Sequence, residues 1–540
     1  MAPPSVPPQR GVADLLNEAG RLQQAGQYPR AEFTLRTAFQ LQPKNPDVLF
    51  ALGWILGQMR REREGMELLK KCLQIEPRRS VAWHELGLLY QNLAEPEKAI
   101  DAYERCMFLN PTFPDAYAAA SMMLEKMREP KKAREVVEKG LKKIPGNPQL
   151  TAFLAQFQAR DGQGAEAERA VRKCLAELQR RGPLESPSIV GDAHRVVRAL
   201  AQALEAQGKH EEAFREYQRS NAIFATTPSA VAALNRAQVS FYDVIESYST
   251  VTRAQCERWA AAEPQDGLPT PAFLVGFPRS GTTMTENALG AHPRITATDE
   301  QSMLSDTEYE ARAVASTFPP AAGVAPAERW THALDSMLPD QISRLRRYYW
   351  DRAKFYTRGA ADAGEFAVQG RLLVDKHPHM LTRLALVNRI FPRARAIVMI
   401  RDPRDCCASG IIQRFAINPA MVQFLSNENT GRCYAAVMNQ WLKVREQLTI
   451  PVLQARYEDT VADFPTYSKR LIEFLGLEWD ARVLDFHEKA AKKYVSTPSF
   501  RAVAQSVNTQ SVARWKRYGE AMAPLLPVLA PFVRAFGYEE

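Results

Sequence analysis

A glycine-rich loop is the first segment of this sequence whose residue types could do chemistry. Residues 273–293 read FLVGFPRSGTTMTENALGAHP, an apolar run that leads through a turn into a predicted helix. Gly276 and Gly281 have the spacing of a phosphate-cradling loop, in which backbone N–H groups and a helix N-terminus hold an anion. Thr282 stands where a nucleoside triphosphatase needs a lysine, and no Walker-B aspartate can be placed. We therefore expect a phosphate other than a Mg-bound triphosphate.

The side chains of the same loop add further donors for an anion. An arginine and three hydroxyl groups, with no dedicated metal ligand, suit a phosphate that carries a different leaving group. We therefore expect no metal in the site. The candidate binding residues of this loop are Pro278, Arg279, Ser280, Gly281, Thr282 and Thr283.

The sequence around this loop predicts an α/β domain. Short apolar runs bounded by turn residues predict strands at 272–277, 371–375, 395–403 and 452–459. Helical spacing between them predicts helices at 284–291, 380–390 and 433–447. This alternation favours a mostly parallel sheet with helices on both faces, and ligands bind beyond the carboxyl ends of such strands.

The loop sequence PRSGTT resembles the 5'-phosphosulfate loop of sulfotransferases that use 3'-phosphoadenosine 5'-phosphosulfate (PAPS). It is most similar to the protein-tyrosine sulfotransferases and to bacterial fusions of tetratricopeptide repeats (TPR) with a sulfotransferase. The resemblance covers about residues 268–535 in four ordered motifs. It implies a P-loop-like sulfotransferase domain, PAPS as the sulfuryl donor, adenosine 3',5'-bisphosphate as the product and no metal requirement.

The segment IVMIRDPRDCCASG resembles the part of this family that holds the 3'-phosphate. A strand delivers Arg401, and Ser409 follows eight residues later. An arginine at a strand end and a hydroxyl in the next helix can hold one phosphate from two sides. A surface ion-pair cluster and an ordinary helix serine are the alternative interpretations of these two residues.

Three further contacts are implied by the resemblance alone. Tyr457 of RYEDTV is expected near the adenine and its phosphates, although a half-buried aromatic is the alternative. Ser499 of TPSF has the spacing of another hydroxyl contact. SVNTQSVARWKRY resembles the C-terminal lid segment, in which Arg514 and, less specifically, Lys516 are the candidate anion ligands.

Sulfuryl transfer needs anion-stabilising donors, a positioned acceptor hydroxyl and a base. Arg279 and the loop supply the donors. Lys376 of VDKHPHM has the position of the family's lysine and is the candidate that assists the leaving group. The spacing from Arg279 to Glu300 is that of the catalytic glutamate in tyrosine sulfotransferases, so Glu300 is the candidate base.

Four residues are rivals of Glu300. Asp299 is adjacent to it, and His292 ends a predicted helix. His377 and His379 flank Pro378 beside the candidate lysine, and a histidine is the base in the cytosolic small-molecule sulfotransferases.

A regular repeat runs through the N-terminal third of the chain. The prolines at positions 43, 77, 111 and 145 keep one constant step, and so do the small residues Ala19, Gly53, Gly87, Ser121 and Ala155. Antiparallel helices approach closely only where side chains are small, and proline ends a helix. This pattern resembles the tetratricopeptide repeat in its period, with five units over about 12–179 and a sixth over about 193–226.

The predicted architecture is therefore multidomain. Residues 1–11 form a Pro-rich disordered N-terminus, 12–245 an all-α TPR solenoid, 246–267 a linker and 268–540 the sulfotransferase domain. Residues 301–365 carry no assignable motif. By position they could form the acceptor wall, and amphipathic packing is the alternative.

Composition limits the class of protein. The chain has 46% hydrophobic and 24% charged residues and a net charge of +9, which fits a globular protein with an anionic ligand or an acidic partner. The sequence has no basic run of the kind that would indicate nucleic-acid binding. No secretory signal or long apolar segment is found, and the seven cysteines form no evident pairs. We expect reduced thiols, no membrane span and a cytoplasmic enzyme.

Three functions remain open at this point. The first is sulfation of a protein tyrosine, with the acceptor protein or peptide docked on the repeats. The second is sulfation of a glycan, lipid or small-molecule hydroxyl, with the repeats serving as a scaffold or a homodimer interface. The third is a catalytically inactive TPR scaffold, which would require a broken motif, and none is broken.

Overall fold

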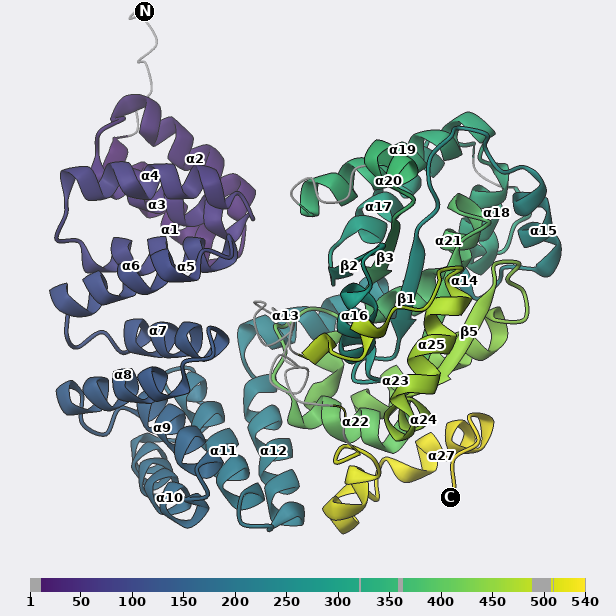
Figure 1. Ribbon diagram of the computed structural model, residues 1–540. Coiled ribbons are helices and arrows are strands. Elements are labelled where there is room, and N and C mark those ends of the chain that lie inside the picture. The colour runs from purple at the N-terminus through teal and green to yellow at the C-terminus, as the bar shows by residue number, and fades with distance from the viewer. Residues whose placement is uncertain (1–10, 320–321, 358–362, 488–506, 508, 540) are drawn as a thin grey trace, which may run out of the picture. The chain divides into compact units, whose positions relative to one another are not determined.

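The computed structural model describes residues 11–319, 322–357, 363–487, 507 and 509–539 (Figure 1). The chain divides into two compact units, residues 1–177 and 178–540. The sequence placed a boundary at 245/246. The difference arises because the sixth predicted helix pair packs with the second unit.

The first unit is a series of helix–turn–helix repeats. Its helices are α1 (Val12–Gln24), α2 (Tyr28–Leu41), α3 (Pro46–Gln58), α4 (Glu62–Ile75), α5 (Ser80–Asn92), α6 (Pro96–Leu109), α7 (Pro114–Lys126), α8 (Pro130–Lys143), α9 (Pro148–Arg160) and most of α10 (Gly164–Arg181). A left-handed residue follows the first helix of each pair, at Gly26, Arg60, Ala94, Arg128 and Gly162. These positions are evenly spaced along the chain, so the backbone itself repeats with the predicted step.

The small residues of the repeat allow helices to approach closely. A Cβ atom on Gly65 would lie 2.6 Å from the carbonyl oxygen of Gly53, and one on Gly87 would lie 2.4 Å from the ring of Tyr103. Real Cβ atoms do not approach other atoms so closely, so these positions require glycine. The predicted solenoid is confirmed.

The second unit begins with helices that precede its sheet. They are α11 (Val190–Glu205), α12 (His210–Ala225), α13 (Pro228–Ala237), the π-helical η1 (Gln238–Tyr242), α14 (Asp243–Tyr248) and α15 (Arg253–Ala261). The sixth predicted repeat corresponds to α11 and α12. The predicted linker 246–267 contains α15, whose Cys256 and Trp259 are buried in the core of this unit. It is a packed part of the second unit and not a free connection.

Five parallel strands form the sheet in the order β2-β3-β1-β4-β5. They are β1 (Ala272–Gly276), β2 (Ile295–Asp299), β3 (Leu372–Lys376), β4 (Arg395–Ile400) and β5 (Val452–Arg456). Two predicted strands were too long, because Pro403 begins a helix after β4 and Tyr457 begins one after β5. β2 was not predicted as a strand, because its sequence ITATD has no apolar run.

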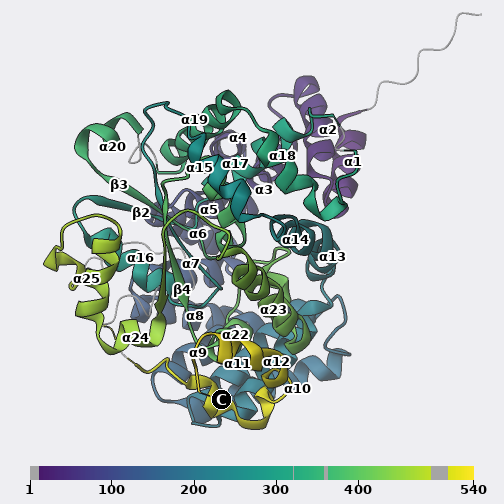
Figure 2. The same cartoon turned by 90° about the vertical axis from the view of Figure 1, so that its right-hand side faces the viewer.

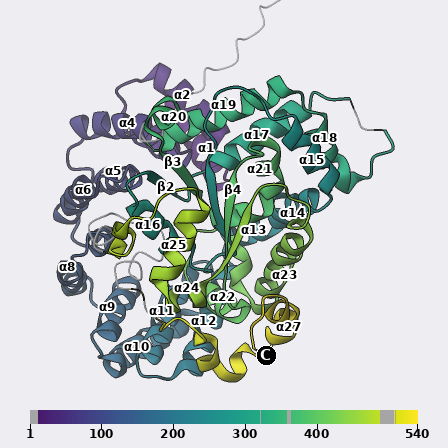
Figure 3. The ribbon, with the colours of Figure 1, turned by 45° about the vertical axis from the view of Figure 1, so that its right-hand side comes forward.

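Helices cover both faces of this sheet, as Figures 2 and 3 show. Alternate residues of β1 separate the two cores: Phe273 and Val275 pack with α19, α21 and α23, and Ala272 and Leu274 pack with α16 and α25. The remaining elements are α16 (Thr282–Ala291), α17 (Met303–Ala315), η2 (Pro326–Glu328), α18 (Arg329–Ser336), α19 (Pro339–Tyr356), α20 (Ala363–Gln369), η3 (Pro378–Arg383), α21 (Leu384–Ile390), α22 (Pro403–Ile412), η4 (Met421–Leu425), α23 (Asn427–Val444), α24 (Tyr457–Ala462), α25 (Phe464–Phe474), η5 (Ala481–Val483), η7 (Arg514–Met522) and α27 (Leu526–Ala535).

The described residues of the segment 301–365, which had no motif, are largely helical. The aromatic residues Tyr349 and Trp350 of α19 are buried in the core, so this face of the helix serves packing. In the parts of the chain that are described, no helix combines the length and the apolar character needed to cross a membrane.

Candidate functional site

The candidate residues lie at the carboxyl edge of the sheet. Because all five strands are parallel, their last residues share one edge, and the chain leaves it at the predicted loop, at Glu300, after Lys376, at Arg401 and at Tyr457. This edge is where open α/β sheets bind ligands.

The glycine-rich loop is closely packed against its neighbours. A Cβ atom on Gly276 would lie 2.6 Å from the carbonyl oxygen of Met399. Gly281 has φ of 100°, and a Cβ there would lie 2.5 Å from the ring of Tyr457. Thr282 begins α16 directly after this turn. The two glycines therefore let the loop turn tightly into the helix, with the ring of Tyr457 against it.

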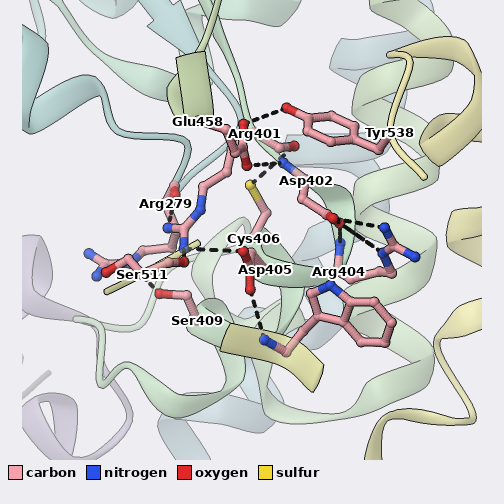
Figure 4. A network of polar contacts seen from close by, with 11 residues as sticks. Arg279, Arg401, Asp402, Arg404, Asp405, Cys406, Ser409, Glu458, Ser511 and Tyr538 are labelled. Atoms are coloured by element: carbon pink, nitrogen blue, oxygen red, sulfur yellow. Dashed lines mark hydrogen bonds and ion pairs between the residues drawn. The ribbon is translucent and has the colours of Figure 1, made fainter. Parts of the chain in front are cut away.

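Arg279, Arg401 and Ser409 meet in one cluster (Figure 4). The Nε of Arg279 donates to the Oγ of Ser409 at 3.0 Å, and the Nη1 of Arg401 donates to the carbonyl oxygen of Arg279 at 3.0 Å. The guanidinium of Arg401 also lies 4.8 Å from the ring centre of Tyr457. The loop and the segment after β4 thus form one continuous cationic cluster.

Burial lowers the pKa of Arg279 to about 10, and the positive charge of Arg401 acts in the same direction. Arg279 is still protonated at neutral pH, so two like charges are held side by side. Such a pair is stabilised by an anion placed between or beside its members.

Two buried polar atoms of this cluster test whether an anion fits. The Oγ of Ser280 and the Nε of Arg401 are buried and have no hydrogen-bond partner among the residues that the structure describes. Buried donors are normally paired. These residues therefore fit a phosphate or sulfate group.

Neighbouring groups fix the backbone beside Arg401. The N–H of Asp402 donates to Glu458 at 3.0 Å, and Tyr538 donates to the same carboxylate at 2.7 Å. Arg404 differs from Arg401, because it pairs with Asp402 at 2.9 Å and lies 4.2 Å from the ring centre of Trp515. Figure 4 shows Arg404 on the far side of this network from Arg279.

The C-terminal segment reaches the same cluster. The Nη2 of Arg401 donates to the carbonyl oxygen of Ser511 at 2.5 Å. Arg514 forms an ion pair with Glu205 of α11, and Lys516 is exposed. Ser499 lies outside the described residues.

Lys376 is fully buried among three carboxylates. Its Nζ lies 2.9 Å from Glu300, 3.2 Å from Asp299 and 3.4 Å from Glu286. Burial alone would lower the pKa of Lys376, but Glu286, Glu300 and Asp299 outweigh it and hold this pKa above its usual value. The candidate lysine and the candidate base thus form one charged group.

The backbone at Glu300 is strained. Its φ is 51°, in the left-handed region. This conformation costs a non-glycine residue about 1–2 kcal/mol. A hydrogen bond of 3.0 Å from its N–H to the carbonyl oxygen of Lys376 holds this conformation. Arg279 and Ala513 also have positive φ, at 73° and 52°. Left-handed residues of this kind therefore occur at three places around the candidate site, where strain is often functional.

The rival bases differ in their surroundings. The Nε2 of His292 lies 3.0 Å from the carbonyl oxygen of Glu478, and its Nδ1 accepts from the N–H of Arg294 at 3.2 Å, so both ring nitrogens are engaged in the fold. Burial lowers the pKa of His377 to about 4 and that of His379 to about 3. Both are neutral at pH 7. His377, His379 and Asp299 remain alternatives to Glu300.

His379 makes a pH dependence of stability testable. Both of its ring nitrogens are buried without a partner in the described part of the chain, and its folded pKa is about 3 against 6.5 normally. Below pH 6.5, His379 therefore binds a proton in the unfolded chain but not in the folded chain. The free energy of unfolding falls as the pH falls from 6.5 toward 3. We expect His379→Leu to reduce this loss by about 1.4 kcal/mol per pH unit, measured by urea unfolding between pH 6.5 and 4.5. Equal pH slopes in the two proteins would contradict this assignment.

Sequence reasoning missed several residues of this site. Glu286 is the sole charged residue of α16 and lies buried beside Lys376. An acid in an otherwise uncharged helix was the available signal. Glu205, Glu458 and Ser511 gave none, because tertiary contacts alone bring them to the cluster.

Comparison with known proteins finds two family matches and several relatives. Residues 271–481 match the profile of the Sulfotransferase family, and residues 46–79 and 80–113 match the tetratricopeptide repeat. The chain is 24% identical over 284 residues to protein-tyrosine sulfotransferase 2 of Gallus gallus, covering 49% of this chain and 69% of that protein.

Two other relatives match over smaller shares of their own length. An uncharacterized protein of Aquifex aeolicus is 26% identical over 266 residues, covering 48% of this chain and 32% of that protein. Nodulation protein NoeE of Sinorhizobium fredii is 34% identical over 145 residues, covering 26% of this chain and 31% of that protein. The chain thus spans about a third of either relative. It carries a sulfotransferase-family domain preceded by tetratricopeptide repeats.

Proposed function

We propose that this protein transfers the sulfuryl group of PAPS to an acceptor hydroxyl, with a protein tyrosine as the favoured acceptor. The observation that carries the proposal is the meeting of Arg279, Arg401 and Ser409 beside buried donors that have no partner among the described residues. A cofactor with two anionic groups on one adenosine matches a cationic cluster that is built from two separate segments.

In this proposal, different residues bind different parts of the cofactor. The loop 278–283 holds the 5'-phosphosulfate, and Arg401 and Ser409 hold the 3'-phosphate. Tyr457, whose ring lies against Gly281 and 4.8 Å from the guanidinium of Arg401, is assigned to the adenine side. Arg514 and Ser499 are assigned as further contacts from the C-terminal segment. PAPS supplies an activated sulfuryl group on a phosphate leaving group when it is bound.

Side chains of the protein then accept the proton of the acceptor and stabilise the charge on the leaving group. Glu300 takes the proton of the acceptor hydroxyl. Arg279 and the protonated ammonium of Lys376 stabilise negative charge where it grows on the leaving phosphate. A phenol has a pKa of about 10, so its deprotonation by a carboxylate accompanies the transfer and does not precede it.

The choice of acceptor rests on the relatives named protein-tyrosine sulfotransferase and on the repeats. TPR solenoids present long surfaces that suit polypeptides. We propose that an acceptor protein or peptide docks there. A glycan, lipid or small-molecule hydroxyl is the competing acceptor class.

Two measurements test this function. Calorimetric titration of the full chain should show tighter binding of adenosine 3',5'-bisphosphate than of AMP, and equal affinities would contradict the assignment of the cluster. Incubation with sulfur-35-labelled PAPS and cell fractions should label protein, with the label recovered as tyrosine sulfate. Label in glycan or lipid alone would replace the acceptor and leave the donor unchanged.

A further inference from the structure

The C-terminal segment 511–518 connects the cationic cluster with the helix pair α11–α12. At the cluster, Ser511 accepts a hydrogen bond from Arg401 at 2.5 Å. The N–H of Trp515 donates to Asp405 at 2.8 Å, and the same carboxylate lies 3.7 Å from Arg401. The segment therefore touches both the arginine and the acid that stands beside it.

The other side of this segment is held by a carboxylate of the helix pair. Glu205, the last residue of α11, accepts hydrogen bonds from Arg514, from the hydroxyl of Tyr518 at 3.2 Å and from the hydroxyl of Tyr217 at 2.9 Å. Phe214 of α12 stacks on Tyr518 with ring centres 4.8 Å apart. One carboxylate thus joins two residues of the segment to the helix pair.

The position of Arg514 depends on this carboxylate. Ala513, directly before it, has a left-handed φ of 52°, so the chain turns sharply where the arginine leaves it. The guanidinium of Arg514 donates to Glu205 and lies 5.9 Å from the ring centre of Tyr518. A long arginine side chain without a counter-ion samples many rotamers, and ordering it costs free energy.

We propose that Glu205 is a positioning residue for nucleotide binding, which holds Arg514 and the segment 511–518 against the cationic cluster. This inference rests on the proposed function and extends it, because a residue of the sixth helix pair then sets the affinity of the sulfotransferase domain for its nucleotide. The pair α11–α12 is in this view a part of the nucleotide site.

The direction of the effect separates this role from simple electrostatics. Removal of a negative charge near a cationic site strengthens anion binding if only the field changes. Loss of a positioning contact weakens it, because the arginine must then be ordered by the ligand. The two explanations therefore predict opposite signs for the same substitution.

The test is calorimetric titration of the full chain with adenosine 3',5'-bisphosphate. We expect Glu205→Gln to raise the Kd about tenfold, the usual size for one charge-assisted hydrogen bond. Glu216→Gln is the matched control, because Glu216 also lies on the helix pair and pairs with Arg219 at 3.4 Å, so its replacement removes the same charge without touching the segment. We expect that control to stay within about twofold of the unaltered protein.

A double-mutant cycle shows whether Glu205 acts through Arg514. In an Arg514→Gln background, Glu205→Gln should change the Kd no further. Glu205→Asp keeps the charge but is one methylene shorter, so we expect an intermediate Kd. If the glutamine variant does not fold, the aspartate variant is used in its place.

The outcomes of this test are distinct. An unchanged or lower Kd in both Glu205 variants, with normal binding by the unaltered protein, would overturn the positioning role alone. A full further loss in the Arg514→Gln background would also overturn it. If the unaltered protein binds no bisphosphate, the proposed function fails and this inference fails with it.

Discussion

Replacement of Glu300 by glutamine is expected to lower the turnover rate by a factor of about 10²–10⁴, the usual contribution of a general base. Glutamine keeps the size of the side chain and a hydrogen-bonding oxygen toward Lys376, which lies 2.9 Å away in the native protein. It cannot take up the proton of the acceptor. The affinity for adenosine 3',5'-bisphosphate should change by no more than a few-fold, because the cationic cluster at Arg279 and Arg401 is left intact.

Asp299→Asn is the matched comparison for this prediction. Asp299 lies 3.2 Å from the same ammonium, so both substitutions remove one negative charge from the surroundings of Lys376. The two side chains differ in access: 39% of the Glu300 side chain is exposed, against 19% for Asp299. A base must reach the acceptor, which favours Glu300. We expect the loss of turnover in Asp299→Asn to be at least tenfold smaller.

The measurement is initial rate at saturating labelled donor, with nucleotide affinity determined in parallel. A near-normal rate in Glu300→Gln would remove this residue as the base. A larger loss in Asp299→Asn would transfer the role to that residue. A loss confined to His377→Asn would transfer it to His377, whose pKa of about 4 leaves it neutral and able to accept a proton at pH 7.

Local sequence patterns predicted the helical repeat and four of the five strands that the structure describes. The constant step of the repeat is a consequence of helix packing, since small residues recur where two helices approach each other, as at Gly65 and Gly87. The buried strands β1, β3 and β4 were visible as apolar runs. β2 was missed as a strand because ITATD pairs on one side only, with β3, and carries polar residues at the edge of the sheet.

The boundary between the two units could not be predicted in the same way. The pair α11–α12 has the pattern of a repeat, but its side chains make contacts with the part of the chain that carries the sheet. Asn221 of α12 donates to the carbonyl oxygens of Ile411 and Phe424 at 2.9 Å and 3.2 Å. Such contacts join residues that are far apart in the sequence, and a periodic pattern carries no information about them.

The candidate site was predicted in part for the same reason. Arg279, Lys376, Arg401 and Tyr457 follow strands or a glycine turn, and the parallel sheet brings such positions to one edge. Glu286 and Glu205 have no such marker. The sequence assigned the two phosphates to two separate segments but did not show that these segments touch: the carbonyl oxygen of Arg279 lies 3.0 Å from a nitrogen of Arg401. That distance depends on the conformation of the loop, which cannot be predicted from the residue types alone.

The second large effect concerns Arg401. We expect Arg401→Ala to raise the Kd for adenosine 3',5'-bisphosphate about 100-fold, because a buried, charge-assisted contact with a phosphate is lost. The Kd for AMP, which lacks the 3'-phosphate, should rise by only a few-fold. The variant therefore loses selectivity between the two nucleotides, and this loss distinguishes a phosphate ligand from a residue that supports the fold.

Arg404→Ala is the control for Arg401→Ala, since it removes an equal charge from the same segment. The Arg404 guanidinium is already engaged with Asp402 at 2.9 Å and with the carbonyl oxygen of Glu539 at 2.6 Å, so it has little capacity for a ligand. Its loss should change both Kd values alike. Arg401→Lys keeps the charge but not the planar fork that also donates to Ser511, and an intermediate Kd is expected. Equal losses for the two nucleotides in Arg401→Ala would show that Arg401 supports the loop and does not bind the 3'-phosphate.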